Sequence, residues 1–426
     1  MRMRVFLLFI CFFFWLICLN GCSDKKSVIS EGKYPVIDIS NSIGNYKKVY
    51  ASDYFSSIEL IPLEIKNNCS INMIEGSTVL VNDSLIFIIS ELSTNHIPLL
   101  RDIFVFNRSG KFLNKIGGIG QGPGEFIGVH KVFLNHEKPT IFVDTYYDIY
   151  EYEYDGKFIN SFHRPNELSV LDVFTYLEKN IFIGAMKYSA SNRCKYILFD
   201  GVGDIIECFP GRCFINSDIQ GYSYWLSAIE PFRIDKQLYL KDCLNDTLYT
   251  FENSNFQPAY VFDFGKDAYP LGEINEDGQK EIKYIVDANM RYIGIKNIIG
   301  TQKYFFYSVL IPPILPKPNY IKEHNRIVHG VYDVNKNTNV LLDTDRYKKR
   351  GIINDLDGGL PIFPQYYAGN NEIVDVWQAD DMLEILTDEY FTSKTIKDKQ
   401  ANQKLKDLLK NLQEDDNPII VIAKIK

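Results

Sequence analysis

The sequence predicts an all-β protein, a six-bladed β-propeller, with a short helical insertion and a C-terminal helix. Three observations support this fold class. Short segments that alternate apolar and polar residues follow one another from residue 50 onward, a hairpin pattern recurs about every 46 residues, and the chain ends in an apolar stretch, Asn417–Lys426. Strands at this spacing are typical of sandwiches, barrels and propellers. The repeat favours the propeller.

Strands are predicted wherever apolar and polar residues alternate between Gly, Asn and Asp turn signals. The composition agrees, because 29 Phe and 28 Tyr favour strands. The predicted strands are Ser57–Ile65, Thr78–Ile89, Asp102–Asn107, Thr140–Asp144, Ile149–Tyr154, Asn180–Ala185, Lys195–Asp200, Asp204–Phe209, Gln237–Lys241, Asp246–Phe251 and Tyr260–Phe264.

The repeat is clearest in two hairpins. Asp102–Gly117 and Asp148–Phe162 both read as a strand, a turn that ends in Gly-Lys-Phe, and a second strand. Glycine after Ser or Asp supplies the positive φ that a tight turn needs. Weaker copies follow at Lys195–Glu207 and Asp246–Glu252. A period of about 46 residues is the size of one four-stranded blade.

Six segments of blade size fill the chain, near 66–117, 124–163, 168–211, 224–265, 290–345 and 355–390. Asn417–Lys426 is predicted to complete the last blade by pairing near the N-terminal strand, which closes the ring without an exposed sheet edge. Two stretches depart from the strand pattern. Glu281–Lys296 has a helical character, and 393–414 reads as an amphipathic helix packed on a blade, with Ile396, Leu405, Leu408, Leu409 and Leu412 at helical spacing.

The N-terminus predicts export and lipid attachment. Arg2 and Arg4 precede an uncharged apolar stretch, Val5–Leu19, which is shorter than the ~20 residues that a membrane-spanning helix needs. Leu19–Cys22 then resembles the lipobox of bacterial lipoproteins, although Asn20 is unusual there. The resemblance implies a signal peptide over 1–21 and a lipid on Cys22, in the cell envelope and on the outer membrane. An uncleaved anchor or a plain secretory signal is the alternative.

After the signal, 22–49 is predicted to be a tether and N-terminal segment, and 50–426 the propeller. The formal net charge of −8, with six dispersed His, argues against nucleic acid as a partner, because nucleic-acid binders cluster Lys and Arg. Five cysteines remain in the mature chain outside the lipid site, and no CxxC pair occurs. Two of Cys194, Cys208 and Cys213 can pair in an oxidising compartment, but small buried thiols are the favoured interpretation.

Specific motifs then point to a family. Gly110-Lys-Phe-Leu leads into Ile116–Phe126, which reads IGGIGQGPGEF, and Asn245–Tyr249 and Phe262–Lys266 read NDTLY and FDFGK. With these motifs the chain resembles the six-bladed β-propeller lipoproteins of gut-dwelling Gram-negative anaerobes, which are similar in shape to NHL-type propellers. The resemblance covers about 50–426. It implies a fold and an envelope location, and it implies no particular reaction.

The glycine-rich run supplies the candidate binding loop. Its residues are Gly120, Gln121, Gly122, Pro123, Gly124 and Glu125. So many Gly and Pro residues form a bent loop rather than a strand, and no Gly-Lys-Ser/Thr follows that would hold a phosphate. The functional interpretation is a loop that lines the funnel, with Gln121 and Glu125 as contacts. The structural interpretation, a connector between blades whose Glu caps backbone amides, is the favoured one.

No motif identifies a catalytic or metal site. His324 and His329 could reach one metal, as in NHL-like lyases, but no HExxH spacing occurs. Asp355–Gly359 only partly resembles a calcium loop, and no nucleophile motif is present. The carboxylates are many, and one sequence cannot pair them: Asp144, Asp148, Asp242, Asp246, Asp355 and Asp357. No cofactor is predicted.

These observations predict a lipid-anchored propeller that binds a glycan, a peptide or a protein at one mouth and catalyses nothing. The alternative is a hydrolase or lyase that works in the central channel. Two or more carboxylates or His within about 6 Å of one another in the channel, close enough to perturb one another's pKa, would favour the alternative.

Overall fold

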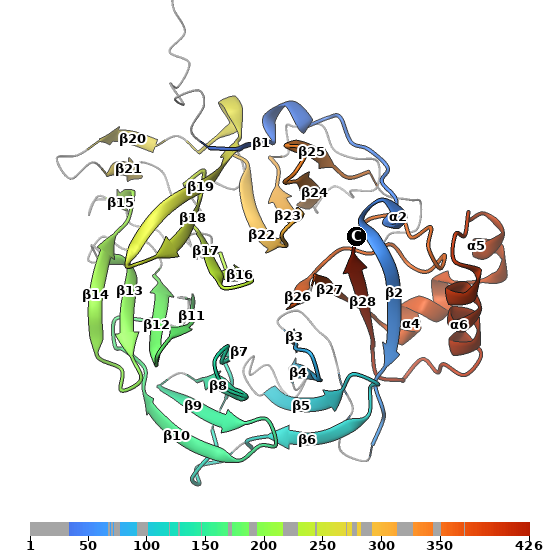
Figure 1. Cartoon of the computed structure of the whole chain (residues 1–426), viewed down its shortest axis with the longest axis horizontal. Coiled ribbons are helices and arrows are strands. Elements are labelled where there is room, and N and C mark those ends of the chain that lie inside the picture. The colour runs from blue at the N-terminus through green and yellow to red at the C-terminus, as the bar shows by residue number, and fades with distance from the viewer. Residues whose placement is uncertain are drawn as a thin grey trace, which may run out of the picture. The chain divides into compact units, whose positions relative to one another are not determined.

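A computed structural model confirms the six-bladed propeller (Figure 1). Antiparallel sheets are arranged around a central axis, with β3, β7, β11, β16, β22 and β26 nearest the centre. The structure describes residues 34–66, 69, 71, 77–91, 101–118, 120–126, 128–145, 147–168, 173–186, 194–215, 229–242, 245–269, 271–274, 279–282, 292–312, 327–343, 351–369 and 371–426.

The blades are numbered in chain order, and each is written from its inner to its outer strand. Blades 1 to 3 are β3 (Thr78–Val81), β4 (Leu85–Glu91), β5 (Arg101–Asn107), β6 (Phe112–Ile116); β7 (Lys131–Leu134), β8 (Thr140–Asp144), β9 (Asp148–Glu153), β10 (Phe158–His163); and β11 (Val173–Glu178), β12 (Ile181–Ala185), β13 (Cys194–Asp200), β14 (Ile205–Pro210). Blades 4 to 6 are β16 (Phe232–Ile234), β17 (Gln237–Lys241), β18 (Thr247–Glu252), β19 (Asn255–Asp263), β1 (Val36–Asp38); β22 (Gly294–Gly300), β23 (Tyr304–Leu310), β24 (Ile327–Asp333), β25 (Thr338–Leu341); and β26 (Tyr366–Gly369), β27 (Glu372–Trp377), β28 (Ile419–Ile425), β2 (Phe55–Pro62).

The predicted closure is confirmed. β28 pairs with β27 on one side and, antiparallel, with β2 on the other, so Pro62 lies opposite Ile419 and Phe55 opposite Ile425. The last blade therefore combines strands from both ends of the chain. Every β28 side chain except Lys424 is buried, because this strand lies inside its sheet.

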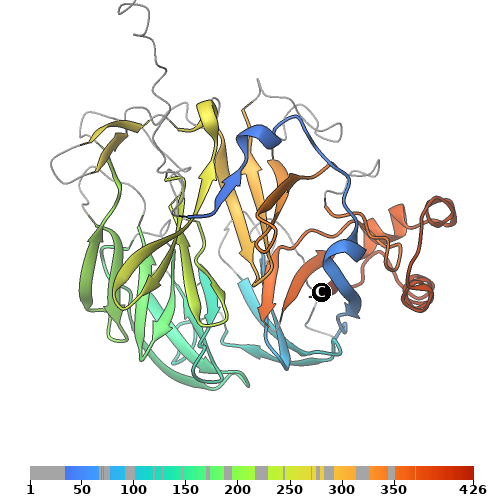
Figure 2. The ribbon, with the colours of Figure 1, turned by 45° about the horizontal axis from the view of Figure 1, so that its top comes forward.

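The N-terminal part of the body runs along the outer edges of three consecutive blades, and we call residues 36–62 the belt (Figure 2). β1 adds in parallel to β19 of blade 4. Lys47 then bridges Leu342 beside blade 5, and Tyr50 bridges Ile353. After the short helix α2 (Ala51–Tyr54), the belt becomes β2 of blade 6. The belt pairs the edges that these sheets would otherwise expose.

The core consists of buried apolar clusters that are each shared by two neighbouring blades. In one of them, Phe174 and Phe182 of blade 3 pack edge-on against Phe133 and Phe142 of blade 2. Because each blade buries its apolar faces only against its neighbours, the ring is stabilised as a whole.

Glycine turns join consecutive blades at the rim. Gly110, Gly156 and Gly203 adopt φ of +81°, +92° and +93°, and each lies in the turn before an outer strand. A Cβ there would lie 2.1 Å from the Pro62 carbonyl oxygen, 2.8 Å from that of Lys115 and 2.2 Å from that of His163, each on the outer strand of the preceding blade. The repeated glycine thus shapes the turn and allows the next blade to approach closely.

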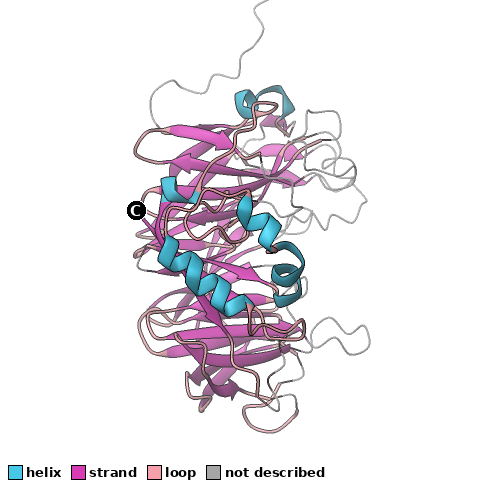
Figure 3. Ribbon diagram, turned by 90° about the vertical axis from the view of Figure 1, so that its right-hand side faces the viewer, coloured by secondary structure: helices cyan, strands magenta, loops and turns pink. Residues whose placement is uncertain are grey.

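Three helices lie between β27 and β28, on the outer flank of blade 6 (Figures 1 and 3). They are α4 (Ala379–Ile385), α5 (Asp388–Thr392) and α6 (Lys399–Leu409). Leu405 and Leu412 join the core of blades 5 and 6, which confirms the predicted amphipathic helix and its packing, whereas α4 and α5 were not predicted. The remaining short elements are η2 (Ser40–Ser42), η3 (Gly265–Asp267), β15 (Cys213–Ile215), β20 (Leu271–Ile274) and β21 (Lys280–Ile282).

Two local predictions are wrong. Thr78–Ile89 is two strands and not one, because Asn82 turns the chain and its side-chain oxygen accepts the amides of Ser84 and Leu85. The helix predicted over Glu281–Lys296 is absent at both ends, which lie in β21 and β22. Its middle, 283–291, falls outside the described residues. Pairing with other strands overrides local helical character at these ends.

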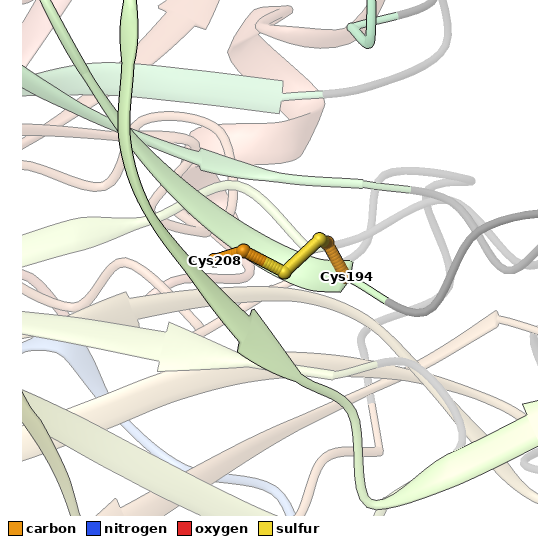
Figure 4. The surroundings of a disulfide bond; sticks show 2 residues. All are labelled: Cys194 and Cys208. Atoms are coloured by element: carbon orange, nitrogen blue, oxygen red, sulfur yellow. A yellow bond between two sulfur atoms is a disulfide. The ribbon is translucent and has the colours of Figure 1, made fainter.

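Cys194 and Cys208 form a disulfide, so the expectation of buried thiols at these two positions is wrong (Figure 4). The bond joins the start of β13 to the facing end of β14, and the two Cα atoms are 5.5 Å apart. Cys194 and Cys208 lie on the two paired strands of one hairpin, and this pairing brings them together. Their separation of 14 positions in the sequence does not by itself reveal the pairing. Cys69 and Cys213 are both buried.

Candidate ligand-binding mouth

The two faces of the ring carry connections of different length. We call the face where inner strands begin and second strands end the entry face, and the opposite face the turn face. Connections on the turn face are short, for example 179–180 between β11 and β12 and 301–303 between β22 and β23. Connections from second to third strands on the entry face include 92–100 and 311–326. Binding residues concentrate on such long connections.

His130, Asp144 and Arg164 form a cluster on the entry face in blade 2. Asp144 ends β8 and is fully buried, and His130 directly precedes β7. His130 Nδ1 lies 2.8 Å from Asp144 Oδ2, and Arg164 Nη1 donates to the same carboxylate at 3.3–3.4 Å. Burial raises the pKa of Asp144, while the hydrogen bond from His130 and the charge of Arg164 oppose that rise. The carboxylate fixes the imidazole, whose side chain remains 23% exposed.

Lys131 extends this cluster across three blades. It begins β7 of blade 2, and its Nζ donates to the Phe174 carbonyl oxygen of blade 3 at 3.2 Å. The same Nζ pairs with the carboxylate of Glu230, which lies just before β16 of blade 4. Contacts among residues at the starts of the inner strands of three blades place these groups on the entry face, beside the central axis of the ring, and we call this region the mouth.

A second polar group lies where blades 5 and 6 meet the entry face. His329 stacks on Phe363 with ring centroids 3.9 Å apart and shares a 2.8 Å hydrogen bond with Ser308. The buried Asp375 accepts from the Phe363 amide and from Gln365 Nε2. Asp375 and Asp144 therefore act alike, since each sits near the end of a second strand and holds the segment that leads into the inner strand of its blade.

On the turn face, by contrast, hydrogen bonds and ion pairs connect neighbouring blades. Arg233 of blade 4 donates to the Leu177 carbonyl oxygen of blade 3 at 2.8 Å. Glu137 of blade 2 accepts from the Tyr176 hydroxyl of blade 3 at 2.5 Å. Arg108 of blade 1 pairs with Glu372 of blade 6 at 2.6 Å. Apart from Arg233 Nε, which is buried without a hydrogen-bond partner among the described residues, these groups are engaged with one another, so the turn face is the less suitable face for a ligand.

The predicted binding loop is a surface turn between blades 1 and 2. Glu125 Oε2 accepts the Gly122 amide at 2.8 Å, and the Gly124 carbonyl oxygen accepts from the Tyr152 hydroxyl at 2.7 Å. Gly124 has φ of +74°, and a Cβ there would lie 2.9 Å from Phe158 Cβ. The described contacts beyond the loop are thus with the outer strands β9 and β10. Binding of a ligand by Gly120–Glu125 stays a prediction.

The proposed calcium loop is part of the packing between blade 6 and its helices. Asp355 accepts from the Ser52 amide and hydroxyl and pairs with Lys397 at 2.9 Å. Asp357 Oδ1 accepts from Asn354 Nδ2 at 2.6 Å and from the Gly359 amide at 2.8 Å. Among the described residues, no group of three His, Cys, Asp or Glu side chains could hold a metal ion. His324, of the predicted histidine pair, lies outside the described residues.

Asp357 is expected to give the chain a specific pH dependence of stability. Burial raises its pKa to about 6, while the two hydrogen bonds to its carboxylate act in the opposite direction. The folded state thus binds a proton more tightly than the unfolded state does. We expect this group to lower the free energy of unfolding as the pH rises from about 4 to about 6, by roughly 3 kcal/mol in total.

Urea denaturation of Asp357→Asn across this pH range measures the effect. The Asn side chain can accept the same two hydrogen bonds without a charge, so the variant should lose this part of the pH dependence. Asp380→Asn, at an exposed position in the first turn of α4, is the control and should follow the unmodified chain. Parallel pH profiles of the Asp357 variant and the unmodified chain would contradict the expectation.

The sequence alone does not indicate that His130 and Asp144 lie together. A hairpin brings them together, and a charged residue at the end of the apolar run Ile141–Val143 was the one available signal. The predicted lipid site, Cys22, and the predicted signal, 1–21, lie outside the described residues. None of the helices in the described ranges is long and apolar enough to cross a bilayer.

Comparisons with known proteins found one solved structure that supports the fold, a second with a lower score, and a family model. A protein of Bacteroides fragilis NCTC 9343, named as an exported protein, superimposes with a TM-score of 0.64 at 18% identity, over 92% of this chain and 100% of that one. A member of the DUF4221 family from Bacteroides vulgatus ATCC 8482 gives 0.49 at 9% identity, over 87% and 97%. No curated protein matches the sequence. A family model matches residues 34–424, and the chain therefore belongs to the family described as "Domain of unknown function (DUF4934)".

Proposed function

We propose that the protein is a lipid-anchored propeller of the cell envelope that binds a glycan, a peptide or a protein at its entry face, without catalysis. The observation that carries this proposal is the cluster of His130, Lys131, Asp144 and Arg164 at the entry face. Its buried charges are costly to desolvate. Asp144 holds the accessible side chain of His130, and the Phe174 carbonyl oxygen and Glu230 hold that of Lys131. A propeller gathers groups from several blades at such a point.

Three observations support an extracytoplasmic location. The N-terminal sequence has the organisation of an export signal followed by a lipobox. The Cys194–Cys208 disulfide is typical of proteins from oxidising compartments. The structurally similar Bacteroides fragilis protein is itself named as exported. Stable anchoring by lipid takes more than one chain, which a diacylglycerol on Cys22 would supply.

Cys22→Ala tests the anchor. Without the thiol there is no site for the lipid, so the variant should appear in the soluble fraction or remain as an uncleaved precursor, whereas the unmodified protein should fractionate with membranes. Cys69→Ala controls for loss of a cysteine as such. A Cys22 variant that is processed normally and still sediments with membranes would rule out lipid attachment at this residue.

His130→Ala tests the mouth as the binding site. Screening arrays of glycans and peptides with the unmodified chain should identify a ligand, and the variant should bind it at least about tenfold more weakly, since hydrogen bonds to charged partners contribute roughly 1.5–3 kcal/mol. His163→Ala is the matched control, because His163 also pairs with an aspartate, at 2.6 Å, but is 90% exposed on the outer strand β10.

The same screen shows whether the ligand binds at the mouth or at the glycine-rich loop Gly120–Glu125. If Gly120–Glu125 contacts the ligand, Glu125→Gln should weaken binding without lowering the melting temperature. If the loop is only a connector, Glu125→Gln should bind normally. Loss of binding in Glu125→Gln together with normal binding in His130→Ala would contradict the proposed location and favour the loop.

A hydrolase or lyase remains the second candidate, and the His130–Asp144 pair favours it. A buried carboxylate that orients an accessible imidazole is an arrangement used for general base catalysis. These two groups are 2.8 Å apart and His130 affects the pKa of Asp144, so they meet the stated requirement for two interacting titratable residues. Incubating the identified ligand with excess and with catalytic amounts of protein distinguishes the two functions. Recovery of intact ligand supports binding alone, and turnover that His130→Ala abolishes supports the enzyme.

A further inference from the structure

Lys131 is an accessible cation at the mouth, and its partner is an unusual one. The Lys131 side chain is 20% exposed, whereas that of Glu230 is 56% exposed. The two residues are 99 positions apart, on blades 2 and 4, and they meet beside Phe174 of blade 3. The Phe174 carbonyl oxygen holds the ammonium group in place at 3.2 Å, so the lysine is positioned independently of the glutamate.

Glu230 therefore marks a place where a carboxylate binds. An exposed glutamate loses side-chain entropy when it is held in one position, and exposed ion pairs contribute little to stability. A carboxylate from a ligand could take the same place beside Lys131. Arg164 and Asp144 are both buried and pair with each other, so Lys131 is the member of this cluster whose positive charge a ligand carboxylate can reach.

An exposed aromatic ring lies on the same face of blade 2, in the connection that follows Asp144. Tyr147, in the connection between β8 and β9, is 77% exposed, and its carbonyl oxygen accepts the Arg164 amide at 2.8 Å. Its backbone is thus fixed next to the residue that holds Asp144. A tyrosine ring offers a flat apolar surface with a polar edge, which suits the ring of a sugar better than the backbone of a peptide.

We propose that the entry face binds a glycan that contains uronic acid residues, with the sugar carboxylate on Lys131 in place of Glu230 and a sugar ring on Tyr147. This assignment rests on the proposed binding function and adds the ligand class. Glu230 then acts as an internal competitor for the lysine. The net charge of −8 gives an acidic ligand no long-range attraction, so its recognition depends on the local contacts.

Isothermal titration with oligomers of galacturonic acid tests this proposal, and the matched neutral probe is the same oligomer with its carboxyl groups reduced to hydroxymethyl groups. Two substitutions should act in opposite directions. Lys131→Met should weaken binding of the acidic oligomer by about tenfold or more, and Glu230→Gln should strengthen it several-fold, because the competing charge is removed. Tyr147→Ala should weaken binding of both probes.

Lys179→Met is the matched control, because Lys179 lies on the turn face with its side chain 78% exposed. It should bind as the unmodified chain does. The opposite changes in affinity expected for Lys131→Met and Glu230→Gln distinguish recognition of the carboxylate from a loss of stability, which would lower the affinity of both variants.

Equal affinity for the acidic and reduced oligomers would overturn the uronic acid assignment while leaving a glycan-binding mouth intact. Binding of a polyglutamate peptide in preference to the acidic oligomer would overturn the glycan class. If neither probe nor any array ligand bound, the proposed function itself would fail.

Discussion

Deletion of residues 417–426 is expected to abolish stable folding. The deletion removes β28, which lies between β27 and β2 and buries six of its seven side chains. Burial of one Ile or Val side chain contributes about 1.5–3 kcal/mol, so the loss approaches the 5–15 kcal/mol by which a typical protein is stable. It also opens the ring and exposes the edges of two strands. Circular dichroism and size-exclusion chromatography of the truncated chain measure the result.

A matched truncation shows whether the effect is specific. A chain that begins at Tyr34 lacks residues that precede the belt but keeps β1, β2 and β28. It should melt cooperatively at a temperature close to that of the unmodified chain. A chain without 417–426 that remained monomeric and melted at the same temperature would show that β28 does not close the ring.

Gly110→Ala is expected to destabilise the protein by several kcal/mol. The residue has φ of +81°, and the added Cβ would lie 2.1 Å from the Pro62 carbonyl oxygen at the end of β2. A backbone oxygen cannot move aside without shifting the outer strand of blade 6. The unfavourable φ costs about 1 kcal/mol or more, and the displaced junction between blades 6 and 1 adds to it. The free energy of unfolding in urea measures the total.

Gly118→Ala is the matched control for the chemistry of the substitution. No heavy atom lies within 4 Å of a Cβ at this position, so the change should be within about 0.5 kcal/mol of neutral. If Gly110→Ala and Gly118→Ala gave equal stabilities, the glycine turn would not be a junction between blades. Gly203→Ala should resemble Gly110→Ala, since its Cβ would lie 2.2 Å from the His163 carbonyl oxygen.

Most of the blade arrangement could be predicted because its signals are local. Turn glycines such as Gly110 and Gly156 recur at the period of a blade, and apolar alternation marks the strands between them. Thr140–Asp144 and Gln237–Lys241 were predicted with the bounds that the structure has. The closure by β28 was also predictable, because an apolar strand at the end of a propeller sequence needs a partner near the other terminus.

The belt and the mouth could not be predicted because they depend on contacts between distant residues. β1 has only three residues, too few for a periodic pattern, and its partner β19 is more than 200 positions away. His130 and Asp144 are 14 positions apart, and Lys131 and Glu230 are 99 apart. Nothing in the sequence indicates that Glu230 precedes an inner strand two blades away from Lys131, since that follows only from the closed ring.

Hydrogen–deuterium exchange with and without a ligand from the array screen tests the central claim most directly. If the entry face binds the ligand, backbone amides in 128–134 and 229–234, around the starts of β7 and β16, should exchange more slowly in the complex. Amides of the turn-face connections 135–139, 179–180 and 235–236 should be unchanged. Protection confined to these turn-face connections, or to the outer strands β6, β10 and β14, would contradict the claim that function resides at the mouth formed by His130, Lys131, Asp144 and Arg164.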